Sequence, residues 1–167
     1  MAIEMPACAR HPNRAPFRGV LTLVGVASDR PPAGARGHRV LLTQAAAEAA
    51  LPSLLGMALD YAPSLDRHDA RRKIGIITSA DVARASNRRD AARLEVAGYV
   101  FGRDFPDAVR ELRAGGRARL GMSYEISDAR VEDVRAAIWT LTDVTFTGAA
   151  VLRRDKAAYR ETWIELQ

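Results

Sequence analysis

A histidine, a serine and an aspartate in this chain have the side-chain types that hydrolytic chemistry requires. Such chemistry needs a nucleophile, a base that takes its proton near neutral pH, and an acid that orients the base. Among the 3 histidines, His68 stands between a polar stretch and the apolar run that begins at Ile74. A histidine at a loop–strand junction can be held rigidly, so His68 is the candidate base. The alternative is a solvated loop residue among charged neighbours.

Ser123 is the candidate nucleophile. Met122 and Tyr124 flank it in an alternating run, so its side chain is expected to point to the opposite face from theirs. Gly121 leaves the backbone open to close approach. Glu125 stands where the nucleophile elbow of an α/β-hydrolase has its second glycine, so that class is not expected. The alternative is an ordinary outward-facing strand serine.

Asp143 is the candidate orienting acid. It lies in the apolar run 140–146, where an isolated carboxylate needs a partner. Asp60 and Asp66 compete for the same role, and Asp143 facing water is the alternative interpretation. The sequence contains no phosphate loop, HExxH helix, calcium loop or metal-ligand spacing, so neither a metal nor another cofactor is expected.

The composition favours one soluble globular domain. The chain has 167 residues, of which 48% are hydrophobic and 27% charged. No run approaches the roughly 18 apolar residues of a membrane span, and the first residues do not have the pattern of a secretory leader. The one cysteine, Cys8, excludes an intrachain disulfide and a multi-cysteine metal site. We therefore expect a protein of a reducing cytoplasm.

The charge balance is basic, with a net charge of +5 and a pI near 10.0. A polyanionic partner would fit that balance. However, the basic residues are arginines except Lys73 and Lys156, and they are spread along an alanine-rich chain, as a GC-rich genome tends to produce. Aromatic residues make up 6% of the chain, too few for a base-stacking platform. Nucleic-acid binding is therefore not expected as the main role.

Short runs rich in branched and aromatic residues predict strands, and they outnumber the predicted helices. Two of these strands are expected to flank a charged loop at 87–90. The helices do not alternate regularly with the strands, which argues against a doubly wound parallel sheet. The predicted class is α+β, with a mainly antiparallel β-barrel core and a few peripheral helices. The expected strands are 17–26, 73–79, 93–101, 118–126 and 136–146.

Helix signals occur at three places. Thr43 can cap a short helix that Pro52 must kink or end. A second helix is expected between Asp104 and the Gly115–Gly116 pair, with a proline in its first turn. Three ranges follow for the whole chain: 1–16 as a flexible N-terminal extension, 17–153 as the domain, and 154–167 as a C-terminal helix.

Three segments, in this order, resemble the HK97-type phage prohead proteases, the capsid-maturation serine peptidases related in fold to herpesvirus assemblins. They are RHDARRKIGIITSAD, then RLEVAGYVFG with AVRELRAGGRARLGMSYEI, then IWTLTDVTFTGAAVL. Family members are similar in having a histidine just before an "IG" strand, a helix and loop leading into a "G-[LM]-S" strand, and an "L-x-[ED]-V-[ST]" strand. The resemblance covers about residues 17–153 and depends on the ordered set of motifs.

The resemblance implies Ser123 as nucleophile, His68 as general base and Asp143 as third member of a catalytic triad. It also implies an assemblin-like barrel. Arg153 and Arg154 follow the third-member strand as the assemblin arginines do, so they are candidates for stabilising the oxyanion. The alternative for both is a pair of solvated arginines.

The resemblance further implies cleavage of the phage major capsid protein and its scaffold segment, inside an assembling procapsid in the cytoplasm of the bacterial host. A homodimer or higher oligomer would match the assemblins. The chain departs from the family at Asp143, where glutamate is common, and at 147–150, where a Pro-Ala-Asn type stretch is frequent. These departures favour the alternative of a catalytically silent structural or scaffolding protein of the same fold. A basic nucleic-acid-binding barrel is the third hypothesis.

Overall fold

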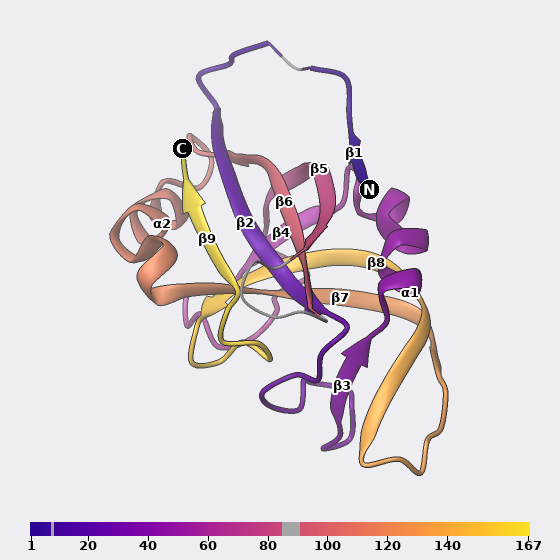
Figure 1. The fold of residues 1–167 in the computed structure, drawn as a ribbon. Coiled ribbons are helices and arrows are strands. Elements are labelled where there is room, and N and C mark those ends of the chain that lie inside the picture. The colour runs from indigo at the N-terminus through magenta and orange to yellow at the C-terminus, as the bar shows by residue number, and fades with distance from the viewer. Residues whose placement is uncertain (8, 85–90) are drawn as a thin grey trace.

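The computed structural model describes residues 1–7, 9–84 and 91–167. A curled mixed sheet forms an open half-barrel, and two α-helices pack against it (Figure 1). The strands follow the order β3-β8-β4-β5-β6-β2-β9, while β1 pairs with β5 and β7 pairs with β8. The strands are β1 (Ala2–Glu4), β2 (Arg14–Val24), β3 (Arg39–Leu42), β4 (Ala58–Tyr61), β5 (Lys73–Arg84), β6 (Ala92–Phe101), β7 (Leu120–Val131), β8 (Ile138–Arg153) and β9 (Trp163–Leu166).

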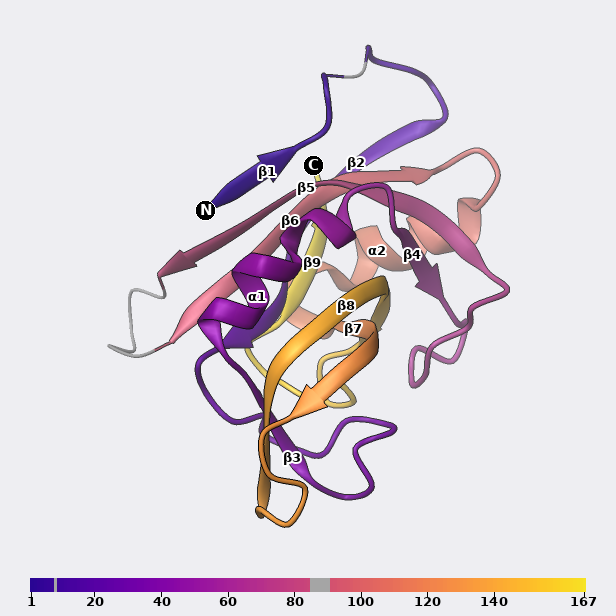
Figure 2. The same ribbon diagram turned by 90° about the vertical axis from the view of Figure 1, so that its right-hand side faces the viewer.

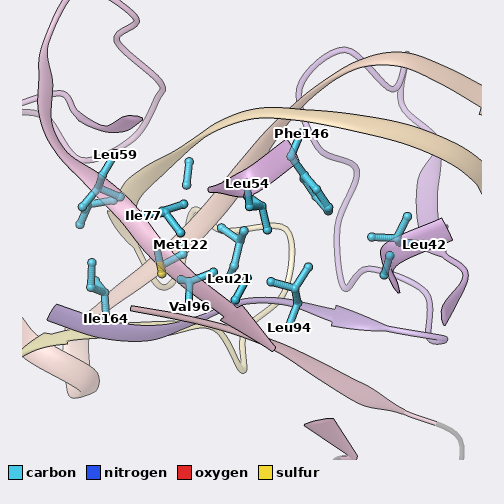
Figure 3. Close-up of a cluster of buried hydrophobic side chains, with 14 of the residues drawn as sticks. Leu21, Leu42, Leu54, Leu59, Ile77, Leu94, Val96, Met122, Phe146 and Ile164 are labelled. Carbon is cyan, nitrogen blue, oxygen red and sulfur yellow. The ribbon is translucent and has the colours of Figure 1, made fainter. Parts of the chain in front are cut away.

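The curled sheet encloses the hydrophobic core (Figure 3). Along β6 every second residue is buried, as the two-residue period of a strand requires when one face meets a core. Burying one large aliphatic side chain contributes about 1.5–3 kcal/mol. The core includes the fully buried Leu21, Leu42, Leu54, Leu59, Ile77, Leu94, Phe146 and Ile164.

Two glycines allow β5 and β6 to approach closely. A Cβ atom on Gly98 would lie 2.0 Å from the carbonyl oxygen of Ile76. A Cβ atom on Gly75 would lie 2.2 Å from the carbonyl oxygen of Tyr99. Neither position can hold a side chain without moving backbone, so these glycines fix the path of the two long strands.

Both internal helices confirm the sequence predictions. The α1 helix (Gln44–Ala50) begins at Thr43, whose hydroxyl accepts a hydrogen bond from the Ala46 N–H, and it gives way to the 3-10 turn η1 (Leu51–Leu54), which contains Pro52. The α2 helix (Pro106–Arg119) is interrupted at Gly116, where φ is 47°. Figure 2 shows α1 beside the sheet; α1 and η1 pack against β5 and β8, and α2 packs against β9 and β7.

The α+β class is confirmed, and most strand pairs are antiparallel, but the expected mainly antiparallel β-barrel is an open, mixed half-barrel. Strand β8 pairs in parallel with both β3 and β4, so the sheet is mixed, and it remains open. Strands β3 and β4 were not predicted. Each is four residues long and pairs with the distant β8, which no local pattern reveals, and β4 also pairs with β5.

The expected C-terminal helix at 154–167 is wrong. Turns lead into β9, which pairs antiparallel with β2. Tyr159 and Trp163 have helical spacing, but the Tyr159 hydroxyl instead donates to the carbonyls of Val26 and Val40. The edge of β2 supplies backbone partners, and this tertiary pairing outweighs the local helical pattern.

The range 1–16, expected as an extension outside the domain, contributes to the sheet. Strand β1 pairs with β5 at Ser79–Asp81, and β2 begins at Arg14, before the expected start of the domain. Cys8 and the predicted charged loop at 87–90 lie outside the described residues. Within the described ranges, no helix is both long and apolar enough to cross a membrane.

Candidate functional site

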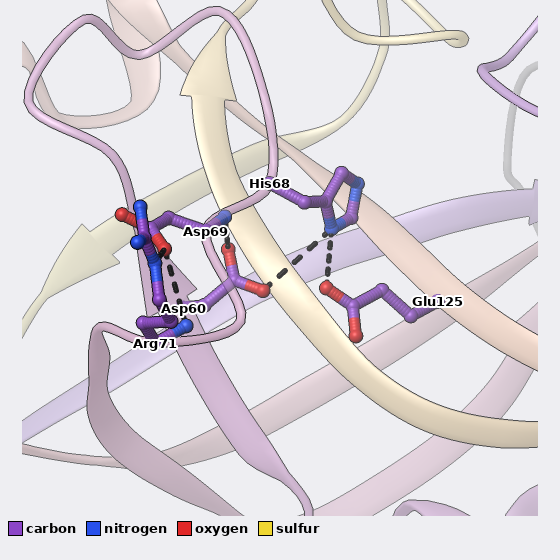
Figure 4. Close-up of polar contacts among 5 residues, drawn as sticks. All are labelled: Asp60, His68, Asp69, Arg71 and Glu125. Atoms are coloured by element: carbon purple, nitrogen blue, oxygen red, sulfur yellow. Dashed lines mark hydrogen bonds and ion pairs between the residues drawn. The ribbon is translucent and has the colours of Figure 1, made fainter.

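The structure brings one imidazole against two carboxylates. His68 lies in the loop between β4 and β5, Asp60 lies on β4, and Glu125 lies on β7. The Nδ1 atom of His68 is 2.7 Å from Oε1 of Glu125 and 3.7 Å from Oδ2 of Asp60 (Figure 4). The second ring nitrogen, Nε2, points away from both carboxylates.

The β4–β5 loop holds His68 through backbone hydrogen bonds. The Asp69 N–H donates to Oδ1 of the buried Asp60 at 3.2 Å. The Arg71 N–H donates to the Asp69 carboxylate at 3.1 Å, and the Arg72 N–H donates to the Asp69 carbonyl at 3.0 Å. These bonds fold the loop back onto the strand that it leaves. His68 lies within this loop, five positions before β5 begins at Lys73, and the bond from its neighbour Asp69 to Asp60 holds it against the sheet.

Strand register places Ser123 on the same face as this cluster. Ser123 pairs with Ala150 of β8, and Ala150 pairs with Asp60 of β4, so the three side chains share one face of the sheet. With strands about 4.8 Å apart, the Cα atoms of Ser123 and Asp60 are about 10 Å apart. Met122 points into the core, which confirms that Ser123 points the other way. No described residue forms a hydrogen bond with the Ser123 hydroxyl.

Glu125 shares the Ser123 face because it lies two residues further along β7, before the bulge that follows it. Its strand partner is Gly148. A Cβ atom on Gly148 would lie 3.1 Å from Oε2 of Glu125 and 3.3 Å from the carbonyl oxygen of Ala58. Gly148 therefore leaves the space in which Glu125 reaches toward His68, and this gives the unusual segment 147–150 a structural role.

The pKa values of Asp60, His68 and Glu125 shift in different directions. Burial alone would raise the pKa of Asp60, but contacts with His68, with Glu125 and with the Asp69 N–H outweigh it and hold that pKa below its usual value. The Asp60 carboxyl and burial raise the pKa of Glu125. Burial opposes protonation of His68, yet the two carboxylates outweigh it and leave the pKa of His68 raised. Asp60 therefore carries the more persistent negative charge of the cluster.

Asp143 does not belong to this cluster, which corrects the sequence expectation. It is exposed on β8, opposite Arg130. It lies seven positions before Ala150, a separation of about 23 Å at ~3.3 Å per residue. Asp66, a competing candidate, is exposed and bonds to Ser64. Asp60, the other competing candidate, is the one that contacts His68.

Glu125 was missed by the sequence analysis. In the sequence alone it stands out only as the residue that breaks a nucleophile elbow. Its signal was its position two residues after Ser123 on an alternating strand, which puts both side chains on one face. Its contact with His68 spans 57 residues of sequence, so spacing alone could not have revealed it.

The two arginine candidates differ in how their side chains are used. Arg154 donates through Nε and Nη2 to the Arg160 carbonyl and through Nη1 to the Arg117 carbonyl. Its guanidinium therefore links the chain after β8 to the end of α2. Arg153 lies 3.5 Å from Asp155 and is half-exposed. Neither guanidinium makes a contact with His68 or Ser123 among the described residues. The arrangement does not favour Arg154 as an oxyanion donor.

Comparison of the chain with protein-family models, with curated proteins and with solved structures finds no match. The functional interpretation therefore depends on the geometry of this site. That geometry defines a class of site: an imidazole oriented by acids at one nitrogen, with a serine on the same sheet face.

Proposed function

We propose that this protein is a serine endopeptidase in which Ser123 is the nucleophile, His68 is the general base and Glu125 orients the base. The observation that most directly supports this proposal is the 2.7 Å contact between His68 Nδ1 and Glu125 Oε1. Ser123 lies two residues before Glu125 on the same face of the strand. Asp60 supports the orientation from the other side at 3.7 Å. In this arrangement the acid fixes the Nδ1–H tautomer and leaves the Nε2 lone pair available.

The reaction follows from that tautomer. Nε2 of His68 takes the Ser123 hydroxyl proton as the oxygen attacks the peptide carbonyl carbon. The tetrahedral intermediate collapses, the C–N bond breaks, and the leaving amine takes the proton from Nε2. Water then repeats the sequence on the acyl-enzyme and restores Ser123. The bond between nucleophile and base often forms fully only with substrate present, so the unbonded Ser123 hydroxyl is compatible with this scheme.

The substrate class is part of the same proposal. The ordered segments that resemble the prohead proteases contain His68 and Ser123, and the resemblance supplies the major capsid protein and its scaffold segment as substrates. An assemblin-like barrel, action inside an assembling procapsid in the host cytoplasm, and a homodimer or higher oligomer belong to the proposal on that ground. The third member differs from the expected Asp143, since Glu125 supplies the acid.

Intact-mass analysis after exposure to a fluorophosphonate tests the proposal, because that reagent labels activated serines. The samples are wild type, Ser123→Ala, His68→Ala and a matched control, Ser127→Ala, which removes another hydroxyl from β7. We expect one adduct on wild type and on Ser127→Ala, and none on the other two variants. Incubation with the capsid protein and scaffold should then give cleavage products that require Ser123.

Two results would overturn the proposal. Labelling that persists in Ser123→Ala would mean that another residue reacts. A wild-type protein that is neither labelled nor able to cleave the capsid substrate would favour the catalytically silent structural protein of the same fold.

A further inference from the structure

The cluster of Asp60, His68 and Glu125 has an unusual charge balance. The chain carries 25 Lys and Arg residues, yet neither Asp60 nor Glu125 pairs with one of them in the described ranges. The only cationic group that contacts the two acids there is the imidazole of His68. Two ionised carboxylates beside one protonated imidazole leave a net negative charge in a partly buried place. A divalent cation beside a neutral imidazole would balance both acids.

The positions of the ligand atoms match a metal ion. One atom from each of Asp60, His68 and Glu125 lies within 4.8 Å of the other two. From His68 Nδ1 the distances are 2.7 Å to Glu125 Oε1 and 3.7 Å to Asp60 Oδ2. Tetrahedral zinc with bonds of about 2.0–2.2 Å places its ligand atoms about 3.3–3.6 Å apart. Shifts well under 1 Å would bring these two contacts to the zinc spacing, and the third pair, Asp60 and Glu125, lies within 4.8 Å.

The surroundings support a binding site in two ways. The Asp69 N–H bonds Oδ1 of Asp60 and so orients that carboxylate, leaving Oδ2 directed at the cluster (Figure 4). The side chains of His68 and Glu125 are 27% and 25% exposed, which gives an ion access and leaves a position for water. The Asp60 side chain is 1% exposed, so it is the buried member of the cluster.

We propose that Asp60 Oδ2, His68 Nδ1 and Glu125 Oε1 form a binding site for a divalent transition-metal ion of the Zn²⁺ type, with water as the fourth ligand. An imidazole nitrogen with two carboxylates suits Zn²⁺ better than Mg²⁺, which prefers oxygen ligands in octahedral geometry. Binding requires the unprotonated Nδ1: from the imidazolium, uptake of the ion releases the Nδ1 proton, and from the neutral Nδ1–H tautomer that proton moves to Nε2.

A consequence for catalysis follows, and it rests on the proposed function. When a metal occupies Nδ1, the proton of the neutral imidazole lies on Nε2. His68 then has no lone pair with which to accept the Ser123 proton. The ion also takes up the two acids that orient the ring. Metal binding and general-base catalysis at His68 are therefore mutually exclusive, and the site acts as an off-switch.

Isothermal titration calorimetry with Zn²⁺, in a buffer that does not chelate, tests the site. Glu125→Gln preserves side-chain shape and removes one ligand charge, and His68→Ala removes the nitrogen. We expect one Zn²⁺ per wild-type chain, a loss of affinity of about tenfold or more in Glu125→Gln, and about 100-fold or more in His68→Ala. Mg²⁺ at the same concentration should not compete.

Control variants separate this site from other zinc ligands and from catalysis. Cys8→Ser and His38→Ala, which removes the ring stacked on Trp139, should bind Zn²⁺ as wild type does. Ser123→Ala should also bind normally, since its hydroxyl is not a ligand. Loss of binding in Cys8→Ser or His38→Ala, equal affinity in His68→Ala and wild type, or no wild-type binding would each overturn the inference.

The two proposals fail separately. If Ser123→Ala and wild type bind Zn²⁺ equally while wild type does not react with the fluorophosphonate, the metal site stands and the peptidase proposal falls. If wild type is labelled and Zn²⁺ neither binds nor slows labelling, the peptidase proposal stands and the metal site falls.

Discussion

Glu125 and Asp60 act on the same ring nitrogen but carry their charge differently. The pKa of Asp60 is held below its usual value, whereas the pKa of Glu125 is raised by the neighbouring Asp60 carboxyl and by burial. The buried Asp60 therefore supplies constant charge, and the closer Glu125 supplies the short contact of 2.7 Å. Such a pair can orient His68 through two acids of different proton affinity.

The first prediction concerns pH. Because the two carboxylates raise the pKa of His68, its neutral, basic form appears only as pH rises through a value above the ordinary 6.5. The fluorophosphonate labelling rate should therefore rise with pH through a midpoint above 6.5. Glu125→Gln removes one of the charges, so the midpoint should fall, and the loss of orientation should lower the maximal rate by about 10²–10⁴-fold. An unchanged midpoint and rate would contradict the assignment of Glu125.

Stability should respond to pH with a definite sign. The raised folded-state pKa of His68 means that its proton-linked stabilisation is present below about 6.5 and is lost as pH rises through the folded pKa. For Asp60, whose pKa is lowered, the stabilisation is present above its ordinary value and is lost as pH falls through the folded pKa. The cluster therefore stabilises the fold best at mildly acidic pH.

The second prediction compares two aspartates. Asp143→Asn should leave the labelling rate within about twofold of wild type and the free energy of unfolding within about 0.5 kcal/mol, because Asp143 is exposed and remote from His68. Asp60→Asn should slow labelling and destabilise the fold by about 1–3 kcal/mol, since the buried carboxylate accepts the Asp69 N–H and faces His68. Urea denaturation and labelling kinetics measure both effects. A large loss of labelling rate in Asp143→Asn would instead support a triad with Asp143 as its acid.

At the scale of elements, the site depends on three strands that are neighbours in the sheet but not in the sequence. Strand β8 lies between β4 and β7, so one residue of β8, Ala150, separates Asp60 from Ser123. Ala150 is fully buried, and its methyl side chain takes up little space on the face that Asp60 and Ser123 share. Gly148, two positions earlier, gives Glu125 its space in the same way. Small residues of β8 therefore shape the site without taking part in its chemistry.

The third prediction tests the close approach of β5 and β6. Gly98→Ala places a Cβ atom 2.0 Å from a backbone carbonyl oxygen, so the strands must separate. We expect a loss of about 3 kcal/mol or more in the free energy of unfolding, measured by urea denaturation. The matched control is Gly102→Ala, whose nearest neighbour would be a side-chain methyl group of Val109 at 3.3 Å rather than a backbone atom, and which should cost about 1 kcal/mol or less. Equal effects of the two substitutions would mean that the strands adjust freely.

Local signals explain which elements could be predicted. Thr43 with its cap bond, and Pro106 with the Gly115–Gly116 pair, mark helix ends within a few residues, so α1 and α2 followed from the sequence. Strand β9 did not, because its stability comes from the edge of β2, more than a hundred residues away. The site divides in the same way: His68 and Ser123 lie in recognisable local contexts, whereas Glu125 meets His68 only through folding.

At the scale of the whole molecule, the curl of the sheet brings its distant strands together beside the site. A Cβ atom on Gly19 of β2 would lie 2.4 Å from the carbonyl oxygen of Trp163 and 2.7 Å from Sδ of Met122. The chain just before β9 also contacts β7, because the Met122 N–H donates to the Thr162 hydroxyl at 3.2 Å. We call these contacts between β2, β7 and the chain before β9 the seam. The seam includes Met122, which directly precedes Ser123.

The fourth prediction tests the seam through Thr162, which is fully buried and whose hydroxyl also donates to the Tyr159 carbonyl at 2.9 Å. Thr162→Val keeps the shape but leaves the Met122 N–H without its acceptor, at a cost of about 1–3 kcal/mol in the free energy of unfolding. Hydrogen exchange at the Met122 amide should become faster, and fluorophosphonate labelling of Ser123 slower, because the strand before the nucleophile is less firmly held. Thr162→Ser retains the hydroxyl and should preserve the labelling rate. If Thr162→Val lost stability but kept the wild-type labelling rate and amide exchange, the seam would stabilise the fold without positioning Ser123, and the site would depend only on β4, β7 and β8.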